Sequence, residues 1–156
     1  MSRPPGVNRI VISLVVICGL LIFWEFRVNT RRAPTYRAAV KDYQNRNYVR
    51  SLAELQTSDE FAPNNPSVLA LMGWNSLKLD KDRAAEKYFS RASRFEPRSP
   101  DPLLGWIYAE ITLEKFQKAE RLLKKFKLRF GETASYQAAE SVLEDQARKT
   151  TRGGGG

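Results

Sequence analysis

The chain of 156 residues contains no histidine and a single cysteine. Without histidine, the commonest general base and the commonest side-chain ligand for metal ions are both missing. Cys18 has no partner for an internal disulfide, and it lies in an apolar run where a thiolate is disfavoured. These absences exclude the histidine-dependent and thiolate-dependent kinds of catalytic site.

Two further kinds of active site find no support in the sequence. The glycines at 153–156 have no helix after them, so they do not match a phosphate-binding loop. Acidic neighbours such as Asp59 and Glu60 lie where a helix end or turn is expected, and a capping role explains them better than acid–base chemistry. We therefore expect a protein that is not an enzyme and that has no catalytic residues, no metal site and no cofactor.

A long uncharged run follows the short basic tail formed by residues 1–9. Residues 10–24 carry no charge. Extending the run to residue 28 gives nineteen residues, close to the ~20 that span a bilayer, and includes Glu25 and Arg27 at its end, where they can reach the headgroups. Trp24 and Phe26 suit the membrane interface. The rival interpretation is a secretory signal, but no small-x-small cleavage pair follows the run. We predict a single transmembrane anchor at 10–28, followed by a linker at 29–33.

The rest of the chain is built from helical patterns that recur. Within residues 66–97, apolar residues are spaced i, i+3, i+4 and i+7 in two segments that a short turn separates, which predicts two helices. Gly73 and Ala85 are small enough to let these helices pack closely, and Pro97 ends the second one. Equivalent positions recur every 34 residues, as in Ala39, Gly73 and Ile107, in Ser51, Ala85 and Ala119, and in Leu55, Phe89 and Leu123.

These residues resemble the pattern of the tetratricopeptide repeat (TPR) family, which has a period of 34 residues. Gly73, Ala85 and Phe89 match the pattern, whereas Asp42, Ser76 and Glu110 stand where the family has tyrosine. The resemblance implies an all-α protein in which a transmembrane helix precedes a TPR-type α-solenoid. Three helix pairs would occupy residues 34–131, a capping helix 132–149, and a flexible tail 150–156.

In this family the first helix of each repeat lines a concave groove that binds peptides or helices. The resemblance assigns nine residues to the groove: Tyr36, Val40, Tyr43, Ala70, Trp74, Leu77, Leu104, Tyr108 and Ile111. Members that clamp a terminal carboxylate use Lys and Asn here, but the corresponding slots hold Tyr36, Val40, Leu71 and Trp74. An aromatic groove favours an apolar peptide or an amphipathic helix. The alternatives are packing between neighbouring helices, for Tyr43, Leu77 and Ile111 above all, and a second copy of the chain, which would form a homo-oligomer.

Basic residues crowd one predicted helix, residues 116–130. Lys118, Arg121 and Lys125 fall on one face of it and form a candidate basic surface. A solvated face is the favoured interpretation, and anionic lipid or an acidic partner is the functional alternative. Nucleic acid is the weakest candidate, because the aromatic residues lie in the groove instead.

We expect a membrane-anchored adaptor that binds a protein partner and aids assembly of a membrane-associated complex. The alternative is a permanently packed structural subunit of such a complex. The expected location is a bacterial inner membrane. The count of Lys and Arg around the anchor favours a cytoplasmic repeat domain, whereas the similarity to membrane-anchored bacterial repeat proteins favours the opposite side.

Overall fold

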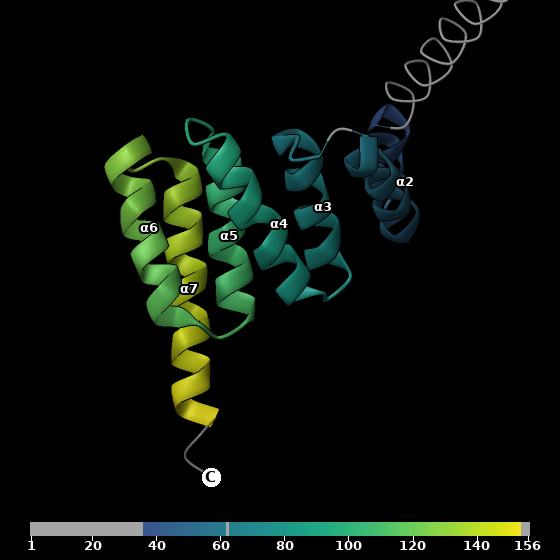
Figure 1. Cartoon of the computed structure of the whole chain (residues 1–156). Helices are drawn as coiled ribbons and strands as arrows, with labels where there is room; N and C mark the ends of the chain where they lie inside the picture. The colour runs from purple at the N-terminus through teal and green to yellow at the C-terminus, as the bar shows by residue number, and fades with distance from the viewer. Residues whose placement is uncertain (1–35, 62, 154–156) are drawn as a thin grey trace, which may run out of the picture.

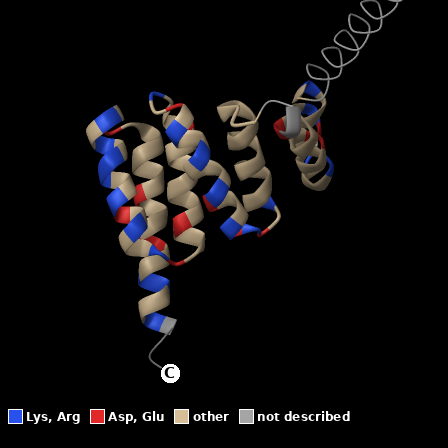
Figure 2. Cartoon of the chain, viewed as in Figure 1, with Lys and Arg blue, Asp and Glu red and all other residues tan. Residues whose placement is uncertain are grey.

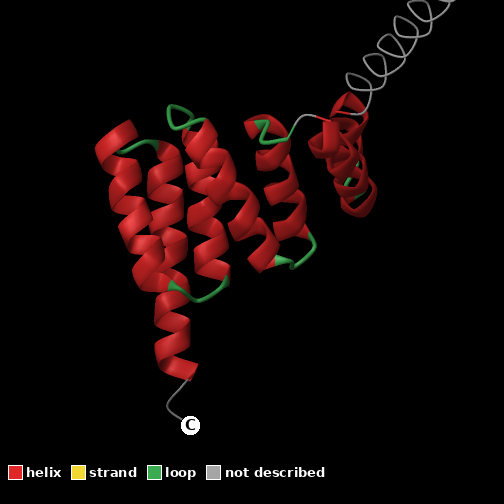
Figure 3. Ribbon diagram, viewed as in Figure 1, coloured by secondary structure: helices red, strands yellow, loops and turns green. Residues whose placement is uncertain are grey.

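The computed structural model describes residues 36–61 and 63–153, and in these ranges every regular element is a helix (Figure 3). A helix at 36–44 comes first. It is followed by α2 (Tyr48–Phe61), α3 (Pro66–Lys78), α4 (Asp82–Phe95), α5 (Pro100–Thr112), α6 (Phe116–Phe130) and α7 (Ala134–Gly153). The expected anchor at 10–28 lies outside the described residues. None of the helices in the described part is long and apolar enough to cross a membrane.

The helices stack as successive pairs (Figure 1). From α2 onward, each helix contacts the next one along the chain, while α3 also contacts α5, and α5 also contacts α7. The first helices of the pairs therefore form one layer, and the second helices cover it. This arrangement confirms the expected all-α solenoid over the described residues.

The 34-residue period also appears in the backbone. The turn inside each helix pair contains one residue with positive φ: Arg46 at 63°, Asp80 at 55° and Glu114 at 56°. These residues are spaced 34 apart, so the same tight turn reverses the chain in all three pairs. Each turn brings the second helix back against the first, which is what allows the apolar faces to meet.

Phe89 occupies the centre of the stack. Its side chain is fully buried on α4 and lies against the backbones of α3 and α5. A Cβ atom added to Gly73 would come within 2.7 Å of the Phe89 ring, and one added to Gly105 within 2.2 Å. Both glycines are therefore required for the close approach of three helices around one ring.

Local features set the start of α5 and the end of α7. Helix α5 begins at Pro100, because proline fits the first turn of a helix, where its missing N–H costs no hydrogen bond. Helix α7 continues to Gly153, through residues expected as tail. The hydroxyls of Thr150 and Thr151 donate to carbonyl oxygens four residues back, and Lys149 pairs with Asp145 at 2.6 Å. These local contacts stabilise the helical conformation of α7 beyond residue 149.

Substituting Gly105 tests the packing around Phe89. Alanine is the better helix former by about 1 kcal/mol, but overpacking a core costs about 1–3 kcal/mol. We therefore expect Gly105→Ala to lower the free energy of unfolding by up to ~2 kcal/mol in urea denaturation followed by circular dichroism. In the Phe89→Leu background, which removes the ring, the same change should cost less. Strict additivity of the two substitutions would contradict the packing argument.

Candidate functional site

A hollow opens on the layer formed by the first helices of the pairs. Its cavity volume is about 320 Å³, and four segments contribute to its wall: the helix at 36–44, α3, the α4–α5 turn and α5. The lining residues are Tyr36, Ser67, Ala70, Leu71, Trp74, Glu96, Ser99, Asp101 and Pro102. We call this hollow the groove. Its wall combines aromatic and aliphatic side chains with two carboxylates.

Trp74 is the largest side chain in the groove, and its neighbours hold it in one orientation. The indole packs edge-to-face on Phe89 with ring centroids 5.0 Å apart, and it lies 6.2 Å from the Tyr108 ring. Its Nε1–H donates to Oδ2 of Asp101 at 3.4 Å. The ring is half-buried, so it can offer part of its surface to a bound molecule without reorganising.

Asp101 places a negative charge at one side of the groove. It lies in the first turn of α5, where the positive end of the helix dipole stabilises a carboxylate. Burial, then Tyr48 and then Asp101 raise the pKa of the Tyr43 hydroxyl. The charge of Asp101 is thus felt at the helix formed by residues 36–44, on the other side of α3. Burial likewise raises the pKa of Tyr108.

The structure brings only part of the expected groove together. Tyr36, Ala70 and Trp74 line the cavity. Five further members are half-buried and do not line the cavity: Val40, Tyr43, Leu77, Leu104 and Tyr108. Leu77 packs near Phe89, and Leu104 and Tyr108 pack on the cluster that α5, α6 and α7 share. Their role in binding stays a prediction.

The structure corrects the assignment of Ile111 to the groove. Only 3% of its surface is exposed, and it belongs to the apolar cluster that joins α5, α6 and α7. The 34-residue register places Tyr43, Leu77 and Ile111 at equivalent positions on the groove side of their helices. At Ile111 the neighbouring α7 covers that face, so this side chain offers no surface to a partner.

Other groove residues escaped the sequence analysis. Asp101 stands 34 residues after Ser67, so the repeat register could have placed both on the groove. Glu96, Ser99 and Pro102 come from the α4–α5 turn and the residues around it. A period read along the helices does not locate them, because their position depends on how the turn folds back toward α3.

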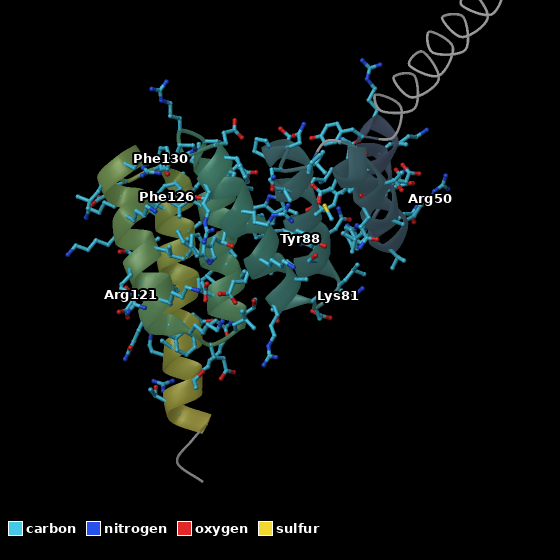
Figure 4. All side chains as sticks on the ribbon, viewed as in Figure 1. Arg50, Lys81, Tyr88, Arg121, Phe126 and Phe130 are labelled. Atoms are coloured by element: carbon cyan, nitrogen blue, oxygen red, sulfur yellow. The ribbon has the colours of Figure 1, made fainter. Side chains whose placement is uncertain are left out.

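The three residues of the expected basic surface on α6 differ in their surroundings. Arg121 and Lys125 are exposed. Figure 2 shows basic positions recurring along this helix, and Figure 4 labels Arg121. The structure corrects the assignment of Lys118 to this surface. Its ammonium lies 2.6 Å from a carboxylate oxygen of Glu86 and 2.6 Å from one of Glu110. Lys118 therefore ties α6 to α4 and α5 and is not a free cation for a lipid or a partner.

Glu110 is the buried centre of this ion-pair network. Its side chain is fully buried, and Trp106 Nε1–H donates to it at 2.5 Å. Lys115 joins the same network, because its ammonium lies 2.7 Å from a carboxylate oxygen of Glu86. Burial alone would raise the pKa of Glu86, but hydrogen bonds from Lys115 and Lys118 outweigh it and lower that pKa from 4.5 to about 2.

An equivalent pair occurs in the first repeat. Arg50 Nε lies 3.1 Å from Asp42 Oδ2, and these residues stand 68 positions before Lys118 and Glu110. Both acids occupy the slot where the family pattern has tyrosine. In the middle repeat the slot holds Ser76, whose hydroxyl donates to the Met72 carbonyl at 2.8 Å. Each departure from the pattern is therefore matched by a local polar partner.

No protein-family model and no curated protein sequence matches the chain. Solved structures do match in shape. They include the Arabidopsis OM64 TPR domain, with 12% identity and a TM-score of 0.68, over 74% of this chain and 96% of that one. The second TPR domain of human RPAP3 in complex with the HSP70 peptide SGPTIEEVD has 15% identity and a TM-score of 0.69, over 74% and 97%.

A third match is the Sgt2 TPR domain from Aspergillus fumigatus, with 14% identity and a TM-score of 0.67, over 80% of this chain and 82% of that one. The fold is that of a TPR domain. At these identities the likeness establishes the fold alone. Among the described residues of the TPR domain, no group of three or more His, Cys, Asp or Glu side chains could hold a metal ion.

The Glu86 network predicts a particular acid sensitivity. Because its pKa falls from 4.5 to about 2 on folding, Glu86 stabilises the fold fully above pH 4.5, and this contribution disappears as the pH falls toward about 2. Over that interval the wild type should lose more unfolding free energy than Glu86→Gln, which has no carboxylate to protonate. Urea denaturation of the full chain at a series of pH values measures the difference.

Glu120→Gln is the matched control for this titration, because Glu120 is exposed on α6. Its stability should follow the wild-type pH dependence. Parallel curves for wild type and Glu86→Gln would contradict the assignment of the network.

Proposed function

We propose that this protein is a non-enzymatic adaptor whose TPR domain binds a segment of a partner protein in the groove. The observation that carries the proposal is the setting of Trp74. A half-buried indole held by Phe89, Tyr108 and Asp101 provides a rigid aromatic anchor of the kind that dominates binding energy at protein interfaces. The RPAP3 domain, of similar fold, is in complex with a peptide, which supports a peptide as the ligand class.

The shape of the groove favours a short extended segment or one face of an amphipathic helix. A volume of about 320 Å³ accommodates a few side chains, at the lower end of the range of ligand pockets. The wall is pre-formed by helices that pack against one another. Binding therefore costs little ordering of the domain, which suits reversible exchange of partners.

The opposite end of the stack supports the alternative of a permanently packed subunit. A wider hollow of about 740 Å³ lies between α6 and α7, and Leu128 on its rim is 81% exposed. A hollow of this size offers space for part of a permanently bound neighbour. Co-purification at fixed stoichiometry that resists salt and survives loss of the groove would favour this second function.

A site-specific cross-linking experiment tests the groove. A photoreactive amino acid at Ser67, which is exposed in the groove wall, should cross-link a discrete partner in cells that express the full chain. The same amino acid at Lys87, exposed on α4, is the matched control and should not give that product.

The double substitution Trp74→Ala with Tyr108→Ala should reduce the Ser67 product on the order of tenfold or more, as expected for loss of an interface hot spot. Circular dichroism verifies that the helices remain. Because Trp74 also contacts Phe89, Ser67→Arg serves as a second variant that blocks the groove from its exposed wall without removing core contacts. An undiminished product in both variants would contradict the proposal.

We further propose that residues 10–28 anchor the chain in a bacterial inner membrane, with the TPR domain on the extracytoplasmic side. The support is the uncharged run and its aromatic border. The anchor would hold the groove near the bilayer and confine the search for partners to membrane-associated complexes.

Membrane extraction and protease protection test the anchor. The chain should stay in the membrane pellet after alkaline carbonate treatment, and deletion of 10–28 should release it. In sealed vesicles of known orientation, protease should digest the TPR domain only from the extracytoplasmic face. Release of the intact chain by carbonate would refute the anchor, and digestion from the cytoplasmic face would refute the orientation.

A further inference from the structure

We propose that the groove recognises a positively charged side chain of the partner, arginine in preference to lysine, and rejects acidic segments. This inference rests on the proposed function and specifies its ligand. The groove would receive the cation between the carboxylates of Asp101 and Glu96 and the aromatic faces of Trp74 and Tyr36.

The charges of the groove wall are the first observation that supports a positively charged ligand. The lining contains two acids and no Lys or Arg, although residues 33–131 carry 18 basic and 12 acidic residues. The hollow is thus an acidic site on a basic domain. A negative hollow surrounded by positive surface attracts a segment whose positive charge is concentrated at one point and repels a uniformly acidic one.

The carboxylates retain capacity for a ligand. Asp101 accepts one long hydrogen bond from Trp74 at 3.4 Å, whereas an ionised carboxylate has about four acceptor positions. Asp101 and Glu96 are both exposed. The ion pairs found among the described residues involve neither of them.

The aromatic residues favour arginine over lysine. Trp74 and Tyr36 both line the cavity, and a cation within about 6 Å of an aromatic face is stabilised by the ring. A planar guanidinium can stack on an indole and donate two parallel hydrogen bonds to a carboxylate at the same time, which an ammonium cannot do. Trp74 and Asp101 already lie in contact, so one guanidinium can reach both.

The same chemistry opposes the kind of peptide seen in a structure of similar fold. The peptide SGPTIEEVD in complex with the RPAP3 domain contains two glutamates and an aspartate. In the present groove, Glu96 and Asp101 would face such charges without a cation between them. The slots that bind a carboxylate in other members of the family likewise hold no Lys or Asn here, but Tyr36, Val40, Leu71 and Trp74.

Selection from a displayed library of random peptides tests the inference. The bait is the full chain in neutral detergent micelles, and the enriched peptides should contain arginine well above its frequency in the library. Selected peptides are then synthesised with each arginine replaced by citrulline, its neutral isostere. Wild type should bind the citrulline forms more weakly on the order of tenfold, the combined effect of a lost carboxylate pair and a lost cation–π contact.

The variant Glu96→Gln with Asp101→Asn should bind arginine and citrulline peptides nearly alike. Asp80→Asn with Glu114→Gln is the matched control, because it removes two charges from exposed turn residues that line neither hollow and take part in none of the ion pairs found among the described residues. This control should keep the wild-type preference. Enrichment of neutral or acidic peptides, or an equal loss of preference in both charge variants, would overturn the inference.

Substitution of the aromatic residues separates this inference from the proposed function. The selected peptides could show no preference for positive charge and still lose binding in Trp74→Ala with Tyr108→Ala. That result would support the groove as the binding site and contradict the inference about charge. If wild type and this variant enrich the same peptides, or wild type enriches none, the groove is not the binding site and both proposals fall.

Discussion

The contact between Phe89 and the two glycines of α3 and α5 is the constraint on which the rest of the structure depends. The ring fills the space that Cβ atoms would otherwise occupy at Gly73 and Gly105. It therefore sets how closely three helices approach one another. The indole of Trp74 packs on the edge of the same ring. The floor of the groove is consequently an extension of the core, and the position of the main aromatic anchor is set by the packing of α4 behind it.

The third helix pair is held together by different means. Ile107 occupies the small-residue slot that Gly73 fills in the second pair, so close backbone packing is replaced there by larger side chains. Glu110, Lys118 and Glu86 then link α5 to α6 and α4 through buried and half-buried charges. Such a network is sensitive to the loss of any one member, because the remaining charge would be buried without a partner. The second helix pair is thus held by the packing of Phe89, and the third by the ion pairs of Glu110, Lys118 and Glu86.

Much of the architecture could be predicted from the sequence, because its determinants are local. The 34-residue period, the apolar spacing and the proline and glycine positions gave the helix pairs and their order. The structure adds that the turn residues Arg46, Asp80 and Glu114 share one backbone conformation. Local contacts between Thr151 and Ala147 and between Lys149 and Asp145 explain why α7 extends beyond the predicted end of the capping helix. Their i, i+4 spacing is visible in the sequence, although the last glycines suggested a tail.

The sequence by itself determined the fold and the face on which a groove would lie, since helical periodicity assigns each residue to a side of its helix. Only the tertiary structure decided which of those residues are open. Ile111 is covered because α7 packs against α5, and Lys118 is neutralised because α4 and α5 bring Glu86 and Glu110 to it. The acidic character of the groove arises in the same way, from a turn that places Glu96 beside α3. Burial and charge pairing depend on segments far apart in the chain, and a local pattern does not record them.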